Sequence, residues 1–209
     1  MGDWDIYLTS EVAAWLDNLQ AIDAKTAGLV DDAIYALSRS GPTLGRPLVD
    51  TIAGSKIKNL KELRPGSSGT SEVRILFAFD SWRSAILLVA GDKSGKWNRW
   101  YATVIPHAEQ LYEIYLKERE EEEAERRRKA LMARQSGQRL AEERKRHGLT
   151  QAQLAQAMGV TPGRVSQIER GELATIDAVA RYVQALGGRL DLIASFGDHT
   201  LTVTTTEAA

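Results

Sequence analysis

Residues 149–171 read LTQAQLAQAMGVTPGRVSQIERG, and this stretch decides the fold of the C-terminal part of the chain. Thr150 and Gln153 have the spacing of a capping box, in which each side chain bonds a backbone amide at the start of a helix. Gly159 permits a tight turn after that helix, and Pro162 suits the first position of a second helix. A helix, a tight turn and a second helix form the geometry that places the second helix in the major groove of DNA.

Further elements flank this motif on both sides. Apolar residues at helical spacing predict one helix over residues 137–147 and another over residues 176–186. Residues 189–196 and 200–204 alternate as two strands, so residues 137–209 should form an all-α helix-turn-helix domain with a C-terminal β-hairpin. The exposed edges of such a hairpin are a template for pairing with a second copy or with the other domain, and we expect a homodimer.

The run from Leu149 to Gly171 resembles the Cro/C1-type repressor family. This resemblance implies that Gln151 and Thr161 hold DNA phosphates and that Gln167 reads a base, where its amide could pair with adenine. Pro162 and Gly163 depart from the family at two positions that often carry base-reading side chains. The candidate DNA-binding residues are Gln151, Thr161, Arg164, Ser166, Gln167 and Arg170. The alternative is a helical bundle that binds no ligand.

A strongly charged stretch precedes this domain. Residues 117–129 read KEREEEEAERRRK and place pairs such as Glu122 and Arg126 four residues apart in the favourable order. This pattern predicts a solvated, charged helical connector over residues 117–136. A nucleic-acid patch at the basic run is the weaker alternative, because the adjacent acidic block neutralises much of its field.

Residues 1–116 have the pattern of an α+β domain, a helical hairpin on an antiparallel sheet. Ser10 stands where an N-cap belongs for the first helix, and Pro106 suits the first residue of the last helix. In one strand Val73 and Ile75 share a face while Arg74 lies on the other, so the second face can display basic groups. The predicted strands are residues 4–8, 57–63, 72–80 and 83–90, and the predicted hairpin helices are residues 10–19 and 23–38.

Three stretches carry a second resemblance: residues 40–50 (SGPTLGRPLVD), residues 60–65 (LKELRP) with residues 74–79 (RILFAF), and residues 91–97 (GDKSGKW). They resemble the Gp49-like toxins of the HigB type in the RelE/ParE superfamily. Toxins of this type precede a HigA antitoxin with a repressor-like domain. The chain therefore resembles a fused HigBA toxin–antitoxin pair, with a RelE-like domain joined by a charged helix to the helix-turn-helix domain.

The second resemblance implies ribosome-dependent cleavage of mRNA, in which a ribose 2′-hydroxyl attacks the adjacent phosphodiester. Such chemistry needs cations around the phosphate, a proton acceptor and a proton donor. By motif, Arg64 and Arg74 would stabilise the phosphate, and Lys61, Lys93 and Lys96 are candidates for further stabilisation or proton transfer. No residue is an obvious general base. A solvated basic face of the sheet is the alternative interpretation of these cations.

Composition narrows the functional classes. The chain has 209 residues, a net charge of −1 and no cysteine. It contains no apolar run of about 18 residues, as a membrane span requires, and its acidic start lacks the pattern of a secretory signal. We therefore expect a cytoplasmic protein with no membrane partner, no cofactor and no metal site, and the length suits two small domains.

The combined interpretation is a type II toxin–antitoxin protein. An mRNA interferase in residues 1–116 would be silenced, by intramolecular or intermolecular contact, by the antitoxin in residues 137–209, which would also bind operator DNA and autoregulate its operon. The expected partners are that operator and mRNA on the ribosome. Two alternatives stay open: a non-enzymatic transcription regulator with a degenerate toxin domain, and a gyrase-directed toxin of the ParE kind fused to its antitoxin.

Overall fold

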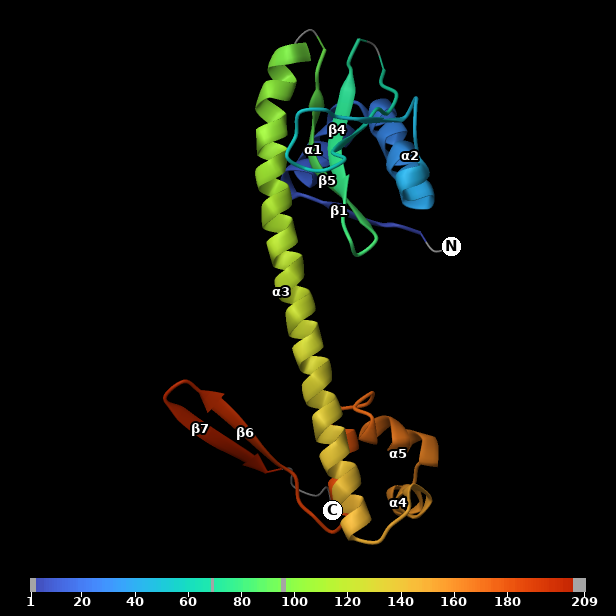
Figure 1. Ribbon diagram of the computed structural model, residues 1–209, viewed down its shortest axis with the longest axis vertical. Coiled ribbons are helices and arrows are strands. Elements are labelled where there is room, and N and C mark those ends of the chain that lie inside the picture. Colours follow the sequence, from blue (N-terminus) through green and yellow to red (C-terminus); the bar gives the residue numbers. More distant parts are fainter. Residues whose placement is uncertain (1–2, 69, 95–96, 205–209) are drawn as a thin grey trace. The chain divides into compact units, whose positions relative to one another are not determined.

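The computed structural model describes residues 3–68, 70–94 and 97–204 and divides into two compact units, Met1–Glu120 and Glu121–Ala209 (Figure 1). Helix α3 (Trp97–Arg146) begins in the first unit and ends in the second. Within the described ranges, no helix combines the length and the apolar character needed to cross a bilayer.

Two helices form the hairpin that the sequence predicts at the start of unit 1. Helix α1 (Ser10–Ile22) and helix α2 (Ala24–Ser40) pack against each other. The hydroxyl of Thr9 accepts from the backbone amide of Val12, so Thr9 is the N-cap and the assignment of that role to Ser10 is wrong by one residue. A threonine in extended conformation serves as well as a serine at this position.

A five-stranded sheet with the order β1-β5-β4-β3-β2 follows the hairpin. Strands β4 and β5 agree with the prediction, whereas the strand predicted over residues 57–63 shortens to three residues and β2 was not predicted. Strand β1 pairs parallel with β5, so the sheet is mixed and the prediction of an antiparallel sheet is wrong at this edge. No hairpin turn fixes the direction of two strands so far apart in the chain. The strands are β1 (Asp5–Leu8), β2 (Val49–Thr51), β3 (Lys61–Leu63), β4 (Val73–Phe79) and β5 (Ser84–Asp92).

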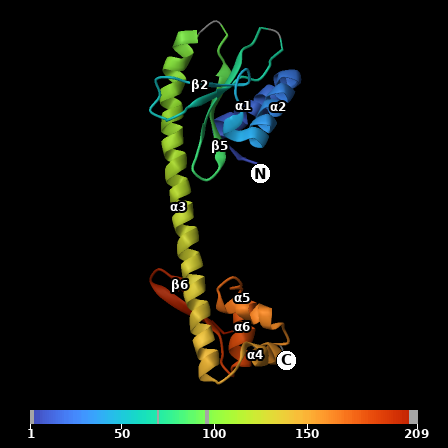
Figure 2. The same cartoon turned by 45° about the vertical axis from the view of Figure 1, so that its right-hand side comes forward.

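Both faces of this sheet are covered. Helices α1 and α2 pack on one face, where Ile75 and Phe77 are buried, and the first part of α3 packs on the other, over Leu76 (Figures 1 and 2). The face that was expected to display basic groups therefore lies under α3. The predicted helix start at Pro106 is also wrong, because residues such as Trp100 pack against the sheet and extend the helix back to Trp97.

Unit 2 has the predicted helix-turn-helix. Its elements are the end of α3, α4 (Gln151–Met158), α5 (Pro162–Glu169), α6 (Ile176–Ala185), β6 (Asp191–Phe196) and β7 (His199–Thr204). The capping box at Thr150, the left-handed Gly159 with φ of 66° and the N-cap at Thr161 are all confirmed. The three short helices pack against the end of α3 and share a core that includes Leu154 and Ile168 (Figure 2).

Gly137 lies inside α3, so the prediction of a separate helix over residues 137–147 is wrong. A Cβ atom at Gly137 would lie 2.6 Å from the carbonyl oxygens of Ile168 and Glu169 at the end of α5. A Cβ at Gly171, which has φ of 74°, would lie 2.5 Å from the carbonyl carbon of Ala133. Glycine at both positions lets the backbones of α3 and α5 touch.

Candidate functional site

A buried carboxylate, Glu62, organises the basic residues of unit 1. Glu62 lies on β3 opposite Leu76, on the face under α3, and is 0% exposed. Its Oε1 atom accepts from Arg64 Nε at 2.6 Å and lies 3.6 Å from Arg74 Nε. The hydroxyl of Tyr101 donates to Oε2 of the same carboxylate. One carboxylate thus fixes two arginines and a tyrosine together.

Lys93 joins this cluster from the end of β5 and is 1% exposed. Its ammonium donates to the hydroxyl of Tyr101 at 3.2 Å. Burial, together with the charge of Arg74, lowers the pKa of Lys93. Burial and the bond to Glu62 raise the pKa of Tyr101 well above its ordinary value. Lys93 is therefore the group of this cluster that is best placed to exchange a proton, while Tyr101 retains its own.

Arg64, Lys93 and Tyr101 line a cavity of about 360 Å³. The side chain of Arg64 is 31% exposed and also lies 2.9 Å from Asp50 Oδ2. Burial acts to lower the pKa of Arg64, but the bond to Glu62 and the charges of Glu62 and Asp50 outweigh it and raise the pKa. The cavity therefore offers a permanent cation beside a buried amine, a suitable pair for a phosphate group. Its other lining residues are Thr51, Ile52, Ala53 and Ile105.

The other catalytic candidates lie elsewhere. The side chain of Arg74 is 15% exposed, donates to the carbonyl of Val73 and does not line the cavity. Lys61 alternates with Glu62 along β3; it donates to Thr51 Oγ1 at 2.8 Å and lines a separate cavity of about 350 Å³. Lys96 lies outside the described residues. Of the five candidates, the structure brings Arg64 and Lys93 to one cavity.

Helix α5, the second helix of the helix-turn-helix, presents a polar face in unit 2. Thr161, Arg164 and Gln167 are exposed, while Val165 and Ile168 face the core. In the described part of the chain, the side chains of Arg164 and Gln167 form no hydrogen bond or ion pair. They are thus available to a ligand that approaches α5 from solvent.

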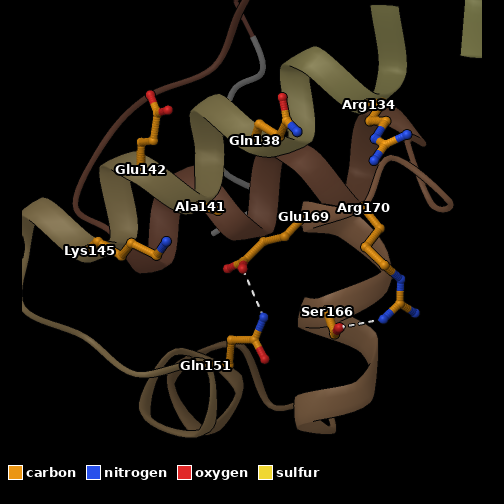
Figure 3. A pocket seen from close by; sticks show the side chains of 9 residues that line it. All are labelled: Arg134, Gln138, Ala141, Glu142, Lys145, Gln151, Ser166, Glu169 and Arg170. Atoms are coloured by element: carbon orange, nitrogen blue, oxygen red, sulfur yellow. Dashed lines mark hydrogen bonds between the residues drawn. The ribbon is translucent and has the colours of Figure 1, made fainter. Parts of the chain in front are cut away.

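The remaining DNA-binding candidates contact other groups of the protein (Figure 3). Gln151 Nε2 donates to Glu169 Oε2 at 2.8 Å. Arg170 donates to Ser166 Oγ at 2.8 Å and forms an ion pair with Glu172 at 2.7 Å. These contacts orient Gln151, Ser166 and Arg170 along one groove beside α5.

A buried network behind that groove holds the helices together. Glu169 accepts from Arg144 Nε at 2.6 Å and from the hydroxyl of Tyr182 at 2.7 Å. Burial acts to raise the pKa of Glu169, but the bonds from Arg144, Gln151 and Tyr182 outweigh it and lower the pKa. The carboxylate therefore stays ionised and ties α5 to α3, α4 and α6. No sequence motif predicts a functional role for Arg144, Glu169 or Tyr182, because their contact depends on how the four helices pack.

Two known families match this chain, one within unit 1 and the other within unit 2. The family described as phage derived protein Gp49-like matches residues 17–113, and the family described as helix-turn-helix matches residues 140–193.

Individual relatives come from Mycobacterium tuberculosis. HigB2, named as a toxin, is 50% identical over 118 residues, which cover 56% of this chain and 57% of HigB2. HigB3, also named as a toxin, is 48% identical over 111 residues, which cover 53% of this chain and 92% of HigB3. The chain thus spans little more than half of HigB2 and nearly all of HigB3.

The C-terminal part resembles proteins of a different name. HigA2 of Mycobacterium tuberculosis, named as an antitoxin, is 42% identical over 67 residues, which cover 31% of this chain and 66% of HigA2. A solved structure described as DNA bound antitoxin HigA3 is 39% identical and covers 33% of this chain and 92% of that chain, with a TM-score of 0.30.

Proposed function

Because this chain belongs to the Gp49-like family that includes HigB toxins, and also carries a helix-turn-helix domain similar to HigA antitoxins, we propose that it joins an mRNA endonuclease to the antitoxin that silences it. The endonuclease lies in unit 1 and the antitoxin in unit 2. The chain works in the cytoplasm, where it meets ribosomes and its own operator.

The cavity lined by Arg64 and Lys93 carries the proposal for unit 1. In the reaction, the 2′-hydroxyl of a ribose loses its proton to water and its oxygen bonds to the adjacent phosphorus. The bond from that phosphorus to the 5′-oxygen of the next nucleotide breaks, and the 5′-oxygen leaves with a proton supplied by the protein. Arg64 neutralises charge on the phosphate, and Lys93 transfers the proton because its pKa is lowered. Glu62 and Tyr101 position these two cations.

The test is cell-free translation with residues 1–120 added. We expect mRNA to be cut only when ribosomes are present, and Arg64→Ala to reduce cutting at least 100-fold, because the cation at the phosphate is lost. Lys25→Ala, on the exposed side of α2, is the matched control and should cut normally. Cutting by Arg64→Ala at the wild-type rate would refute the role of Arg64.

One observation favours a second candidate function. Glu62 already neutralises part of the charge of Arg64 and Arg74, as expected of a purely structural ion-pair cluster. Folded residues 1–120 that leave both mRNA and growth intact would support a non-enzymatic regulator. Replication arrest with intact mRNA would support a gyrase-directed toxin instead.

The polar face of α5 carries the proposal for unit 2. We expect binding to DNA upstream of the gene itself, with an affinity that falls steeply as salt rises. Gln167→Ala should lower the preference for that operator by about 1–3 kcal/mol, whereas Gln156→Ala on the exposed face of α4 should not. An unchanged preference in Gln167→Ala, measured by competition with random duplex, would exclude base reading by Gln167.

Tethering explains how one chain can be harmless. Two units of one assembly that can reach each other meet at roughly millimolar effective concentration, so unit 2 of the same or a paired chain can occupy unit 1 continuously. The hairpin of β6 and β7 supplies the contact between two copies, as its exposed edges suggest.

A further inference from the structure

A groove of about 520 Å³ runs beside the recognition helix in unit 2 (Figure 3). One wall is the last part of α3, and the other carries Gln151, Ser166 and Arg170 from α4 and the end of α5. The groove residues of α3 recur at three- or four-residue spacing, so they share one face of that helix. They are Arg134, Gln138, Ala141, Glu142 and Lys145.

The cations on the α3 wall differ from several paired cations on the same helix. Arg134 and Lys145 are exposed and, among the described residues, neither forms a salt bridge. Arg126, Arg128 and Arg146 instead pair with glutamates at 2.7–2.9 Å, at positions outside the groove. Arg134 and Lys145 therefore bring to the groove two cations that no salt bridge holds.

The acidic residues of the groove do not cancel this charge. Glu169 is already neutralised by Arg144 and accepts bonds from Tyr182 and Gln151. Glu142 is an exposed carboxylate on the α3 wall and opposes the cations in part. Arg170 forms an ion pair with Glu172, so its charge is partly offset. Arg134 and Lys145 are therefore the main source of positive potential in the groove.

We propose that this groove binds two neighbouring backbone phosphates of DNA, one at the Arg134 end and one at the Lys145 end, and that α3 thereby extends the DNA-binding surface beyond the helix-turn-helix. The inference rests on the proposed DNA binding of unit 2. A phosphate suits the chemistry of the groove, because two cations face an amide and a hydroxyl across it. Phosphate contacts carry no sequence information, so α3 raises the affinity for every duplex equally.

The experiment measures binding of the full chain to a fluorescein-labelled 24-base-pair duplex of random sequence at several salt concentrations. A plot of the logarithm of the binding constant against the logarithm of the salt concentration becomes less steep by about 0.9 for each lost phosphate contact. At 0.1 M salt this change corresponds to about an eightfold loss of affinity. We expect this loss in Arg134→Ala and in Lys145→Ala. Glu142→Gln should strengthen binding, because it removes the opposing charge.

Arg139→Ala is the matched control, because Arg139 is exposed on α3 but does not line the groove. The inference is supported if Arg134→Ala and Lys145→Ala lose slope and affinity while Arg139→Ala does not. It is overturned if all three variants behave alike in a wild-type background that binds DNA. A wild-type chain that binds no duplex overturns the proposed DNA binding itself, and the two failures are thus distinguished.

Discussion

Glu169 is the residue on which unit 2 depends most, because four helices meet at its carboxylate. Glu169→Gln leaves Arg144 buried without a counter-charge, and breaking a buried pair in this way costs about 3–5 kcal/mol. Urea unfolding followed by far-UV circular dichroism should show the loss. All five tryptophans lie in unit 1, so their fluorescence should report an unchanged transition for that unit.

The exposed pair of Arg170 and Glu172 provides the control, and Glu172→Gln should destabilise unit 2 far less than Glu169→Gln, because solvent screens the pair. Equal costs for Glu169→Gln and Glu172→Gln would contradict the importance of burial.

The same carboxylate predicts how unit 2 responds to acid. The pKa of Glu169 in the folded state lies below its ordinary value of 4.5, because the bonds from Arg144, Gln151 and Tyr182 outweigh burial. The ionised carboxylate of Glu169 therefore contributes fully to the free energy of unfolding above pH 4.5, and this contribution is lost as the pH falls through the lowered pKa. Stability of Glu169→Gln should lack this dependence, and parallel acid curves for the two proteins would count against the network.

Sequence could identify some of these side chains but not their surroundings. Arg64 and Lys93 belong to motifs, so the sequence predicts them as site residues. Glu62 escapes such a prediction, because a glutamate between basic residues normally faces solvent, and only the packing of α3 shows that it is buried. Lys61 was grouped with Arg64 by motif, although the alternation of β3 separates it from the cavity.

The close contact between helices α3 and α5 predicts how alanine at two glycine positions changes the stability of unit 2. Gly137→Ala places a Cβ atom 2.6 Å from two carbonyl oxygens, so it should destabilise unit 2 although alanine favours helix. Gly163→Ala is the matched control, because its Cβ would meet only Thr161 Oγ1 at 3.9 Å, and it should stabilise α5 by up to about 1 kcal/mol. The same urea curves check both variants, and stabilisation by both would show that the helices are not in close contact.

The hairpin of β6 and β7 has an apolar face that is exposed to solvent. The register places Leu201 and Val203 on one face with Phe196, and they are 54%, 46% and 56% exposed. An isolated two-stranded hairpin is marginally stable, so this face needs a partner, which we propose is a second copy. Leu201→Asp should convert a dimer into a monomer in sedimentation experiments, whereas Thr202→Asp on the other face should not. Equal masses for Leu201→Asp and the wild type would exclude this dimer contact.

Elements were predictable where local signals define them. Caps and a glycine turn specify α4 and α5, because these signals act within a few residues. The start of α3, the short strand β2 and the parallel edge β1 depend on packing between residues distant in sequence. Because the start of α3 depends on such packing, a prediction based on proline at the first helical position is nine residues too late.

At the scale of the whole molecule, covalent linkage of the two units is the central feature. Cutting the chain between them replaces a roughly millimolar effective concentration by the concentration of the free pieces, so at nanomolar protein unit 2 should leave unit 1. The intact chain should therefore be inert where the cut chain is not.

A protease recognition sequence inserted after Lys129, in the charged part of α3, allows this comparison on a single sample. Messenger RNA cleavage in a ribosome-containing extract is measured before and after protease is added, with Arg64→Ala in the same background as the control. We predict no cleavage by the intact chain, cleavage after the cut, and none by the cut Arg64→Ala chain. If the cut chain leaves mRNA as intact as the uncut chain does, a tethered and silenced endonuclease is not what this protein is.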